Sequence, residues 1–172
     1  MPSIRADIVD VYIARESRGV VEFLQLHRTN DPLADTWQPV MGHVEREESV
    51  VETAVRELGE EVGLCDGDES WLGFWQLEDV HPYFVARLDA VLLSPRLLVE
   101  VVGSWTPDIS GEQTHDDYRW VCADALDELF MWPGQVRACR EAVNLLATRG
   151  SAFERALRLG LPTRSSDEPD PA

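Results

Sequence analysis

The order of the sequence patterns predicts an α/β fold in which helices cover both faces of a central sheet. Three observations support this class. Strand-like apolar runs open the chain, a helical pattern follows at 48–62, and more strand-like runs precede a second helical pattern at 134–148. This order is neither strict strand–helix alternation nor all strands, so the sheet should be mixed.

The first two strands are expected at 8–14 and 20–27, on either side of a polar turn that ends at Gly19. The segment 37–44 contains Pro39 and Gly42 and should form a short, irregular strand. From 48 to 62 the apolar residues recur at helical spacing, and Gly63 should end the helix. The apolar positions are Val51, Ala54, Val55, Leu58 and Val62.

Four further runs at 71–80, 82–93, 97–102 and 118–122 read as strands, and two or three of them should join the central sheet. The helix at 134–148 should cover the other face and continue as 151–159 after Gly150. A chain of 172 residues is too short for two ordinary domains, so we expect one domain over 1–160. The chain lacks apolar anchors from Thr163 onward, and residues 161–172 are expected to form a disordered acidic tail.

Composition excludes several partners and mechanisms. The net charge of −17 should repel duplex nucleic acid but still allows a small phosphorylated substrate beside bound cations. The chain contains no lysine, which removes P-loop and Schiff-base chemistry. No apolar run approaches the roughly 20 residues that span a bilayer, and no signal-peptide pattern opens the chain. We therefore expect a cytoplasmic protein with no membrane partner, and we leave a homodimer open.

The helix at 48–62 carries the strongest chemical signal. At about 100° per residue, Glu57, Glu60 and Glu61 project within a narrow arc, away from the apolar stripe. Like charges at this spacing repel, and a hard divalent cation such as Mg²⁺ or Mn²⁺ would reverse that cost. Arg56 could pair with Glu48 or hold a ligand carboxylate in place. On spacing alone, a solvated surface charge run explains these residues equally well.

Gly42, Glu48 and the run at 56–64, Arg-Glu-Leu-Gly-Glu-Glu-Val-Gly-Leu, together resemble the Nudix box, G-x5-E-x7-R-E-U-x-E-E-x-G-U, at every defined position. This resemblance implies an α/β/α sandwich with a mixed sheet. It also implies a hydrolase that uses Mg²⁺ or Mn²⁺ to split compounds linked to a nucleoside diphosphate. The metal ligands it implies are Glu57, Glu60, Glu61 and the carbonyl of Gly42.

Shorter stretches at 24–28, 37–45, 115–120 and 132–135 are similar to one branch of that family, the dihydroneopterin triphosphate and dATP pyrophosphohydrolases. In this resemblance Arg28 and Gln38 contact a triphosphate or base, although each could equally be an ordinary strand residue. Trp37 is a candidate for stacking on the substrate, together with three other aromatic residues that could instead belong to the core: Trp75, Phe84 and Trp105.

The general base is where the sequence departs from that branch. A glutamate usually precedes the histidine of its Glu-His-x-x-Tyr-x-Trp pattern, but Thr114 stands there in this chain. Glu112 is expected to act as base instead, because Gly111 beside it lets the loop bend. Asp116 and Asp117 are the loop alternatives, and strand alternation should point them in opposite directions. Glu60, within the box, is the remaining candidate.

The sequence thus predicts a metal-dependent pyrophosphohydrolase acting on a nucleoside triphosphate-like or pterin triphosphate-like small molecule. Glu60, Arg56 and Glu112 are the residues assigned to its catalysis. One alternative is a Nudix-fold nucleotide-binding or regulatory domain without turnover, and another is a hydrolase of a different nucleoside diphosphate derivative. An isomerase of the isopentenyl-diphosphate type would need an activated cysteine, for which Cys65 and Cys122 are poorly placed. The remaining alternative is an acidic interaction protein whose box is coincidental.

Overall fold

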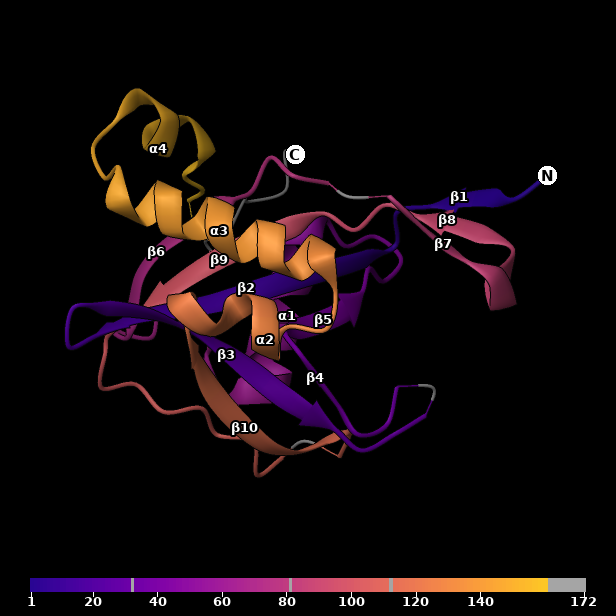
Figure 1. The fold of residues 1–172 in the computed structure, drawn as a ribbon, viewed down its shortest axis with the longest axis horizontal. Helices are drawn as coiled ribbons and strands as arrows, with labels where there is room; N and C mark the ends of the chain where they lie inside the picture. The colour runs from indigo at the N-terminus through magenta and orange to yellow at the C-terminus, as the bar shows by residue number, and fades with distance from the viewer. Residues whose placement is uncertain (32, 81, 112, 161–172) are drawn as a thin grey trace, which may run out of the picture.

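A seven-stranded mixed sheet forms the centre of the computed structural model, which describes residues 1–31, 33–80, 82–111 and 113–160 (Figure 1). The sheet runs in the order β10 (His115–Cys122), β3 (Val20–Arg28), β2 (Ile8–Ser17), β9 (Arg96–Val101) and β6 (Trp71–Gln76). β4 (Thr36–Gln38) also pairs with β3, and β5 (Val40–His43) pairs with β2. β2 and β9 run parallel while the other pairs are antiparallel, which confirms the expected mixed sheet.

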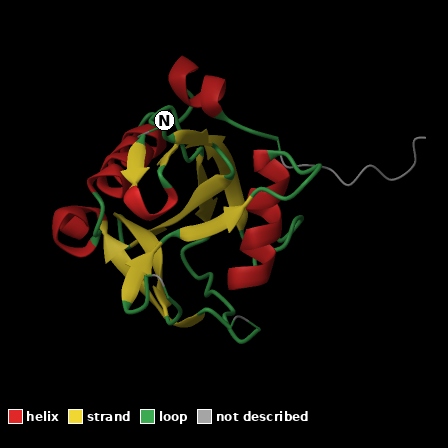
Figure 2. Ribbon diagram, turned by 90° about the vertical axis from the view of Figure 1, so that its right-hand side faces the viewer, coloured by secondary structure: helices red, strands yellow, loops and turns green. Residues whose placement is uncertain are grey.

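The two longest helices lie on opposite faces of this sheet. Successive residues of β2 point to opposite sides, and each side packs against a different helix. Val9, Val11 and Ile13 pack in the cluster that contains α1 (Val50–Val62). Tyr12 and Ala14 pack in the other cluster, beneath α3 (Pro133–Ala147). Figure 2 shows helices on both sides of the strands. The predicted α/β/α sandwich is therefore confirmed.

Both ends of α1 are set by local sequence. Ser49 caps the N-terminus, and Glu52 completes a capping box with it. Gly63 ends the helix in the left-handed region, at φ 70°, as the sequence predicts. Glu48 thus lies just before the cap, so its side chain can turn back along the helix.

The expected strand at 82–93 is interrupted. β7 (Tyr83–Val85) and β8 (Ala90–Leu92) are separated by a 3₁₀ turn, η1 (Ala86–Leu88), which closes at Asp89 with φ 45°. Aspartate tolerates this conformation better than most residues, and the apolar pattern of the segment concealed the turn. Together with β1 (Ser3–Arg5), which is too short for a readable alternation, these strands form a separate three-stranded sheet.

Three elements complete the C-terminal half. β10 begins at His115, three residues earlier than expected. A 3₁₀ turn, η2 (Ala123–Ala125), leads into the short helix α2 (Leu126–Leu129), and neither was predicted. α4 (Ala152–Leu157) follows Gly150 as expected. The predicted tail at 161–172 lies outside the described residues, and within the described part no helix has the length and apolarity needed to cross a membrane.

Candidate active site

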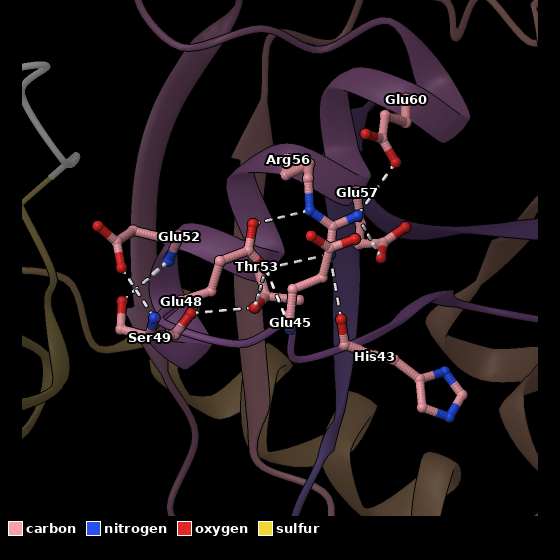
Figure 3. Close-up of polar contacts among 9 residues, drawn as sticks. All are labelled: His43, Glu45, Glu48, Ser49, Glu52, Thr53, Arg56, Glu57 and Glu60. Atoms are coloured by element: carbon pink, nitrogen blue, oxygen red, sulfur yellow. Dashed lines mark hydrogen bonds and ion pairs between the residues drawn. The ribbon is translucent and has the colours of Figure 1, made fainter.

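Arg56 is the centre of the polar network on α1 (Figure 3). Its Nε donates to Oε1 of Glu48 at 2.9 Å and its Nη2 donates to Oε2 at 3.2 Å, a two-pronged contact. Its Nη1 donates to Oε1 of Glu57 at 2.8 Å and to Oε2 of Glu60 at 3.1 Å. Nη2 also donates to the carbonyl of His43 at 3.1 Å. Arg56 therefore makes both contacts proposed for it: it pairs with Glu48 and holds two of the candidate ligands.

The Arg56 guanidinium also controls ionisation in this network. Its hydrogen bonds to Glu48 lower the pKa of that carboxyl to about 2. The same contact, followed by the charge of Glu57, raises the pKa of Arg56. Both partners are consequently charged at neutral pH, where Glu48 does not gain a proton and Arg56 does not lose one.

Glu57 lies against the backbone of β5. Its side chain is only 12% exposed, and a Cβ added to Gly42 would stand 2.0 Å from its Oε1. Burial raises the pKa of Glu57, and the charge of Arg56 acts in the opposite direction. Glycine at position 42 is therefore what allows this carboxylate to approach the strand.

The three candidate metal ligands differ in exposure. The Glu60 side chain is 59% exposed, whereas Glu61 is 7% exposed. The spacing of the three glutamates suggested that Glu61 lies on an exposed face of the helix, but Glu61 is buried. The arc of carboxylates therefore extends from the exposed side of α1 at Glu60 to its packed side at Glu61. Within the described residues, no three carboxylate, imidazole or thiol groups already converge as a metal-binding cluster. The donors nonetheless fit a hard cation, since all are oxygens and Gly42 leaves its backbone bare beside Glu57.

The candidate substrate contacts lie on two sides of the sheet. Arg28 and Gln38 are on strand positions in phase with Leu26, whose side chain packs in the α1 cluster. Gln38 is buried, with its Nε2 3.1 Å from Nε2 of His115, and Arg28 donates from Nε to the carbonyl of Asn30 at 3.0 Å. The structure thus brings Arg28 and Gln38 to the face that α1 covers.

Trp37 is on the opposite side, because it is the register partner of His27 rather than of Leu26. Its ring centroid lies 4.9 Å from that of His27, with the two planes tilted by 47°, and the Arg119 guanidinium lies 4.3 Å from its centroid. The other aromatic candidates have structural surroundings or lie away from α1. Trp75 is fully buried, Trp105 packs edge-on against Trp120, and Phe84 is exposed on the small sheet.

Glu112, the expected base, lies outside the described residues. Thr114 turns its hydroxyl toward Nδ1 of His115, at 3.2 Å. Asp116 lies 2.6 Å from Nδ1 of His27, and Asp117 is the register partner of His27. A bulge between His115 and Asp117 breaks the alternation, so both aspartates lie beside His27, away from α1. The expectation that they point in opposite directions is therefore wrong.

Thr53 belongs to the site but was not identified from the sequence. It is fully buried, and its hydroxyl donates to Oε2 of Glu48 at 2.9 Å. The available signal was its spacing, because Thr53 stands three residues before Arg56 and thus on the same side of the helix. A threonine within an apolar helical pattern is easily taken for an ordinary core position.

Comparison with known proteins places this geometry in a family. The family model described as NUDIX domain matches residues 4–141. An Ap4A hydrolase of C. elegans in a binary complex superposes with a TM-score of 0.67 at 19% identity, over 83% of this chain and 98% of that one. A protein described as a NUDIX hydrolase from Listeria monocytogenes gives a TM-score of 0.68 at 26% identity, over 83% and 95%.

The dihydroneopterin triphosphate pyrophosphohydrolase of E. coli also superposes, with a TM-score of 0.66 at 21% identity, over 84% of this chain and 99% of that one. At that identity the superposition establishes a shared fold and leaves the substrate open. No curated protein matches the chain by sequence. The family match covers most of the chain and includes every box residue, so this protein belongs to the NUDIX family.

Proposed function

We propose that this protein is a metal-dependent pyrophosphohydrolase of a nucleoside triphosphate-like or pterin triphosphate-like small molecule, cleaved by attack of water at phosphorus. One observation carries the proposal. Arg56 gathers Glu48, Glu57 and Glu60 around one guanidinium, next to the bare backbone of Gly42. An ordinary solvated charge run gives no reason for a half-buried glutamate pressed against a glycine.

The proposed metal ligands are Glu57, Glu60, Glu61 and the carbonyl of Gly42, and the proposed cation is Mg²⁺ or Mn²⁺. The cation supplies charge neutralisation at the diphosphate oxygens and makes water more acidic. Arg56 keeps Glu57 and Glu60 oriented and partly balances their mutual repulsion. Glu48 in turn anchors Arg56 and does not itself meet the substrate.

Substrate contacts are proposed for Arg28 and Gln38, which lie on the face of the sheet that α1 covers. A guanidinium recognises phosphate through paired N–H donors, and a side-chain amide can read a ring edge. Trp37 is left out of the proposed site because it lies across the sheet from both. Specificity for the base or pterin is therefore assigned to the β3–β4 corner.

Proton removal from the attacking water is proposed for Glu112, with Glu60 as the alternative. Among the described residues Glu60 is well placed, because its exposed carboxylate can reach water while one oxygen stays bound to Arg56. Asp116 and Asp117 are disfavoured by their position beside His27. Glu112→Gln separates the two, because loss of a base costs roughly 10²- to 10⁴-fold in rate, whereas a rate within a few-fold of the wild type leaves Glu60 as the base. Glu60→Gln does not separate them, because Glu60 is also a proposed metal ligand.

A substrate screen tests the proposed function directly. Nucleoside triphosphates, pterin triphosphate, nucleotide sugars and dinucleoside polyphosphates such as Ap4A would be incubated with the protein and Mg²⁺, and phosphate and pyrophosphate measured separately. We expect pyrophosphate release from a triphosphate and none after EDTA treatment. Preferred cleavage of Ap4A or of a nucleotide sugar would contradict the substrate class, and turnover in EDTA would contradict the role of the metal.

The alternatives have less support. A binding domain without turnover would show saturable nucleotide binding and no product in the same screen, although this chain keeps every box carboxylate. A cysteine-dependent isomerase is disfavoured because burial raises the pKa of the Cys139 thiol, which lies on α3, across the sheet from α1. Cys65 and Cys122 are exposed, and neither is among the residues that Arg56 contacts.

A further inference from the structure

Thr53 is a buried hydroxyl residue in the first turns of α1, next to the Arg56 network. It is 0% exposed, although the neighbouring Glu52 is exposed on the helix surface. A buried hydroxyl has a single proton to donate and requires an acceptor for it. The acceptor that receives this proton decides what Thr53 does.

Two acceptors lie within reach of the Thr53 hydroxyl. Oε2 of Glu48 is 2.9 Å away and the carbonyl of Ser49 is 3.0 Å away. The Ser49 carbonyl already accepts the backbone N–H of Thr53, at 3.0 Å. Glu48 is ionised beside Arg56, and a hydrogen bond to a charged acceptor is stronger than one to a neutral carbonyl. The proton is therefore donated to Glu48.

This bond determines where Glu48 stands. Oε2 of Glu48 also accepts from Nη2 of Arg56 at 3.2 Å and from the backbone N–H of Glu45 at 3.3 Å, so the Thr53 hydroxyl makes the shortest of its three contacts. It is also the one donor that comes from the packed side of α1. With Nε and Nη2 both on Glu48, Arg56 presents only Nη1 to Glu57 and Glu60.

We propose that Thr53 is a positioning residue of the metal site, because its hydroxyl holds Glu48, and Glu48 holds Arg56 in the orientation that offers one nitrogen to the ligand carboxylates. The inference rests on the proposed function, since that assigns a cation to Glu57 and Glu60. Without the hydroxyl, Glu48 can turn away, and Arg56 then loses the two hydrogen bonds that its Nε and Nη2 make with Glu48. A released Arg56 can direct two nitrogens at Glu57 and Glu60 and so compete with the cation for the same oxygens.

The test compares Thr53→Val, which keeps the shape and removes the hydroxyl, with Thr53→Ser, which keeps the hydroxyl. Binding of Mn²⁺ alone would be measured by calorimetry, with no substrate present. We expect Thr53→Val to weaken Mn²⁺ binding about tenfold, the lower end of the effect typical for groups that orient metal ligands. Thr53→Ser should stay within about twofold of the wild type, because its hydroxyl can reach the same oxygen.

Kinetics give a second readout. The Mg²⁺ concentration for half-maximal hydrolysis should rise in Thr53→Val by about the same factor as the Mn²⁺ dissociation constant. kcat at saturating Mg²⁺ should fall by less, because excess cation displaces the guanidinium. A purely structural defect would instead lower kcat at all Mg²⁺ concentrations and leave the half-saturation value in place.

Ser94→Ala is the matched control. Ser94 is also buried, and its hydroxyl donates to a carboxylate, Oδ1 of Asp10, at 2.9 Å. Asp10 alternates with Val9 and Val11 on β2 and therefore lies on the α3 side of the sheet, away from the metal site. Ser94→Ala should lower the unfolding temperature as much as Thr53→Val does, yet leave Mn²⁺ binding unchanged.

A double variant tests whether Thr53 acts through Glu48. Adding Thr53→Val to Glu48→Gln should change the Mn²⁺ dissociation constant by less than about twofold, because the acceptor charge is already gone. The inference is overturned if folded Thr53→Val binds Mn²⁺ as the wild type does, if Ser94→Ala weakens binding equally, or if the two substitutions are fully additive. A wild type that hydrolyses substrate in EDTA and binds no Mn²⁺ overturns the proposed function as well.

Discussion

At the scale of single residues, Gly42 and Glu57 make the most specific steric fit of the site. An alanine at 42 would place its Cβ 2.0 Å from Oε1 of Glu57, so one of the two must move. The atoms it meets belong to the end of a flexible side chain, and Glu57 can swing away at little cost to the fold. Gly42→Ala should therefore lower kcat/KM at least about tenfold, as loss of ligand orientation does, while the unfolding temperature stays within a few degrees.

Gly59→Ala on α1 is the control for that experiment. A Cβ at Gly59 meets only Sγ of Cys65, at an ordinary 3.9 Å. Alanine in a helix interior is favoured over glycine by about 1 kcal/mol, so this variant should keep its activity and gain stability. Equal losses of activity in both variants would show that the helix, and not the Gly42–Glu57 fit, is sensitive to added volume.

Replacement of Glu60 and of Glu61 by glutamine should lower activity alike but should differ in its effect on the unfolding temperature. Glutamine at either position removes a proposed ligand charge and should lower kcat by about a hundredfold or more. Glu60→Gln replaces an exposed side chain, so this variant should unfold at the wild-type temperature. Glu61→Gln replaces a buried side chain and should shift the unfolding temperature. Rates near wild type in both variants would refute the metal assignment. Thermal unfolding followed by circular dichroism measures the expected difference in unfolding temperature.

At the scale of elements, a buried carboxylate on the C-terminal helix α4 bonds to the edge strand β6. Glu154 accepts from Nε1 of Trp75 at 2.8 Å and from Nη1 of Arg158 at 2.9 Å. Beyond α4, the backbone N–H of Leu159 donates to the carbonyl of Phe74. The contacts that close the β6 edge therefore come from a segment beyond the residues matched by the family model, which end at 141.

Glu154 should make stability depend on acidity in a definite direction. The hydrogen bond from Trp75, followed by that from Arg158, lowers the pKa of Glu154 below its ordinary 4.5. Its stabilisation is therefore complete above about pH 4.5 and is lost as the pH falls through the folded-state pKa. Glu154→Gln should lower the unfolding temperature by about 3 °C or more at pH 7, the shift expected from weakening one charged hydrogen bond in a chain of this size.

That difference should shrink as the pH falls below 4.5, because the protonated wild type then resembles the glutamine variant. Calorimetric scans of both proteins from pH 7 to pH 3 measure it. Asp127→Asn serves as the comparison, since Asp127 pairs with Arg140 on the exposed surface and such pairs contribute little. A Glu154→Gln deficit that stays constant over the whole range would exclude this carboxylate as the source.

At the scale of the whole molecule, the net charge of −17 governs which partners can approach. Nucleic-acid binding releases counterions from phosphates that meet lysine and arginine, and this chain has no lysine and no basic run. It should show no shift of duplex DNA in gel electrophoresis at physiological salt and micromolar protein. A salt-dependent shift under those conditions would reveal a basic surface that the average charge conceals.

The sequence by itself determined the fold class and the family. Apolar periodicity identified α1 and its end at Gly63, and the sequence also suggested that Arg56 pairs with Glu48 or holds a ligand carboxylate, because these contacts lie within one helix and the turn before it. Helical periodicity and strand alternation are local properties, and local geometry converts them directly into faces. The placement of two helices on opposite sides of a mixed sheet follows from the same patterns.

Only the tertiary structure decided which of those residues meet across the chain. The close approach of Gly42 to Glu57, the burial of Glu61 and the separation of Trp37 from Gln38 depend on how β5, β4 and β10 pair, and no periodicity reports strand register. The bulge at Asp116 reversed an expectation based on alternation, since one extra residue redirects every side chain after it. Which strands pair, and in which register, depends on the free energy of the whole core, and therefore the local sequence pattern cannot predict it.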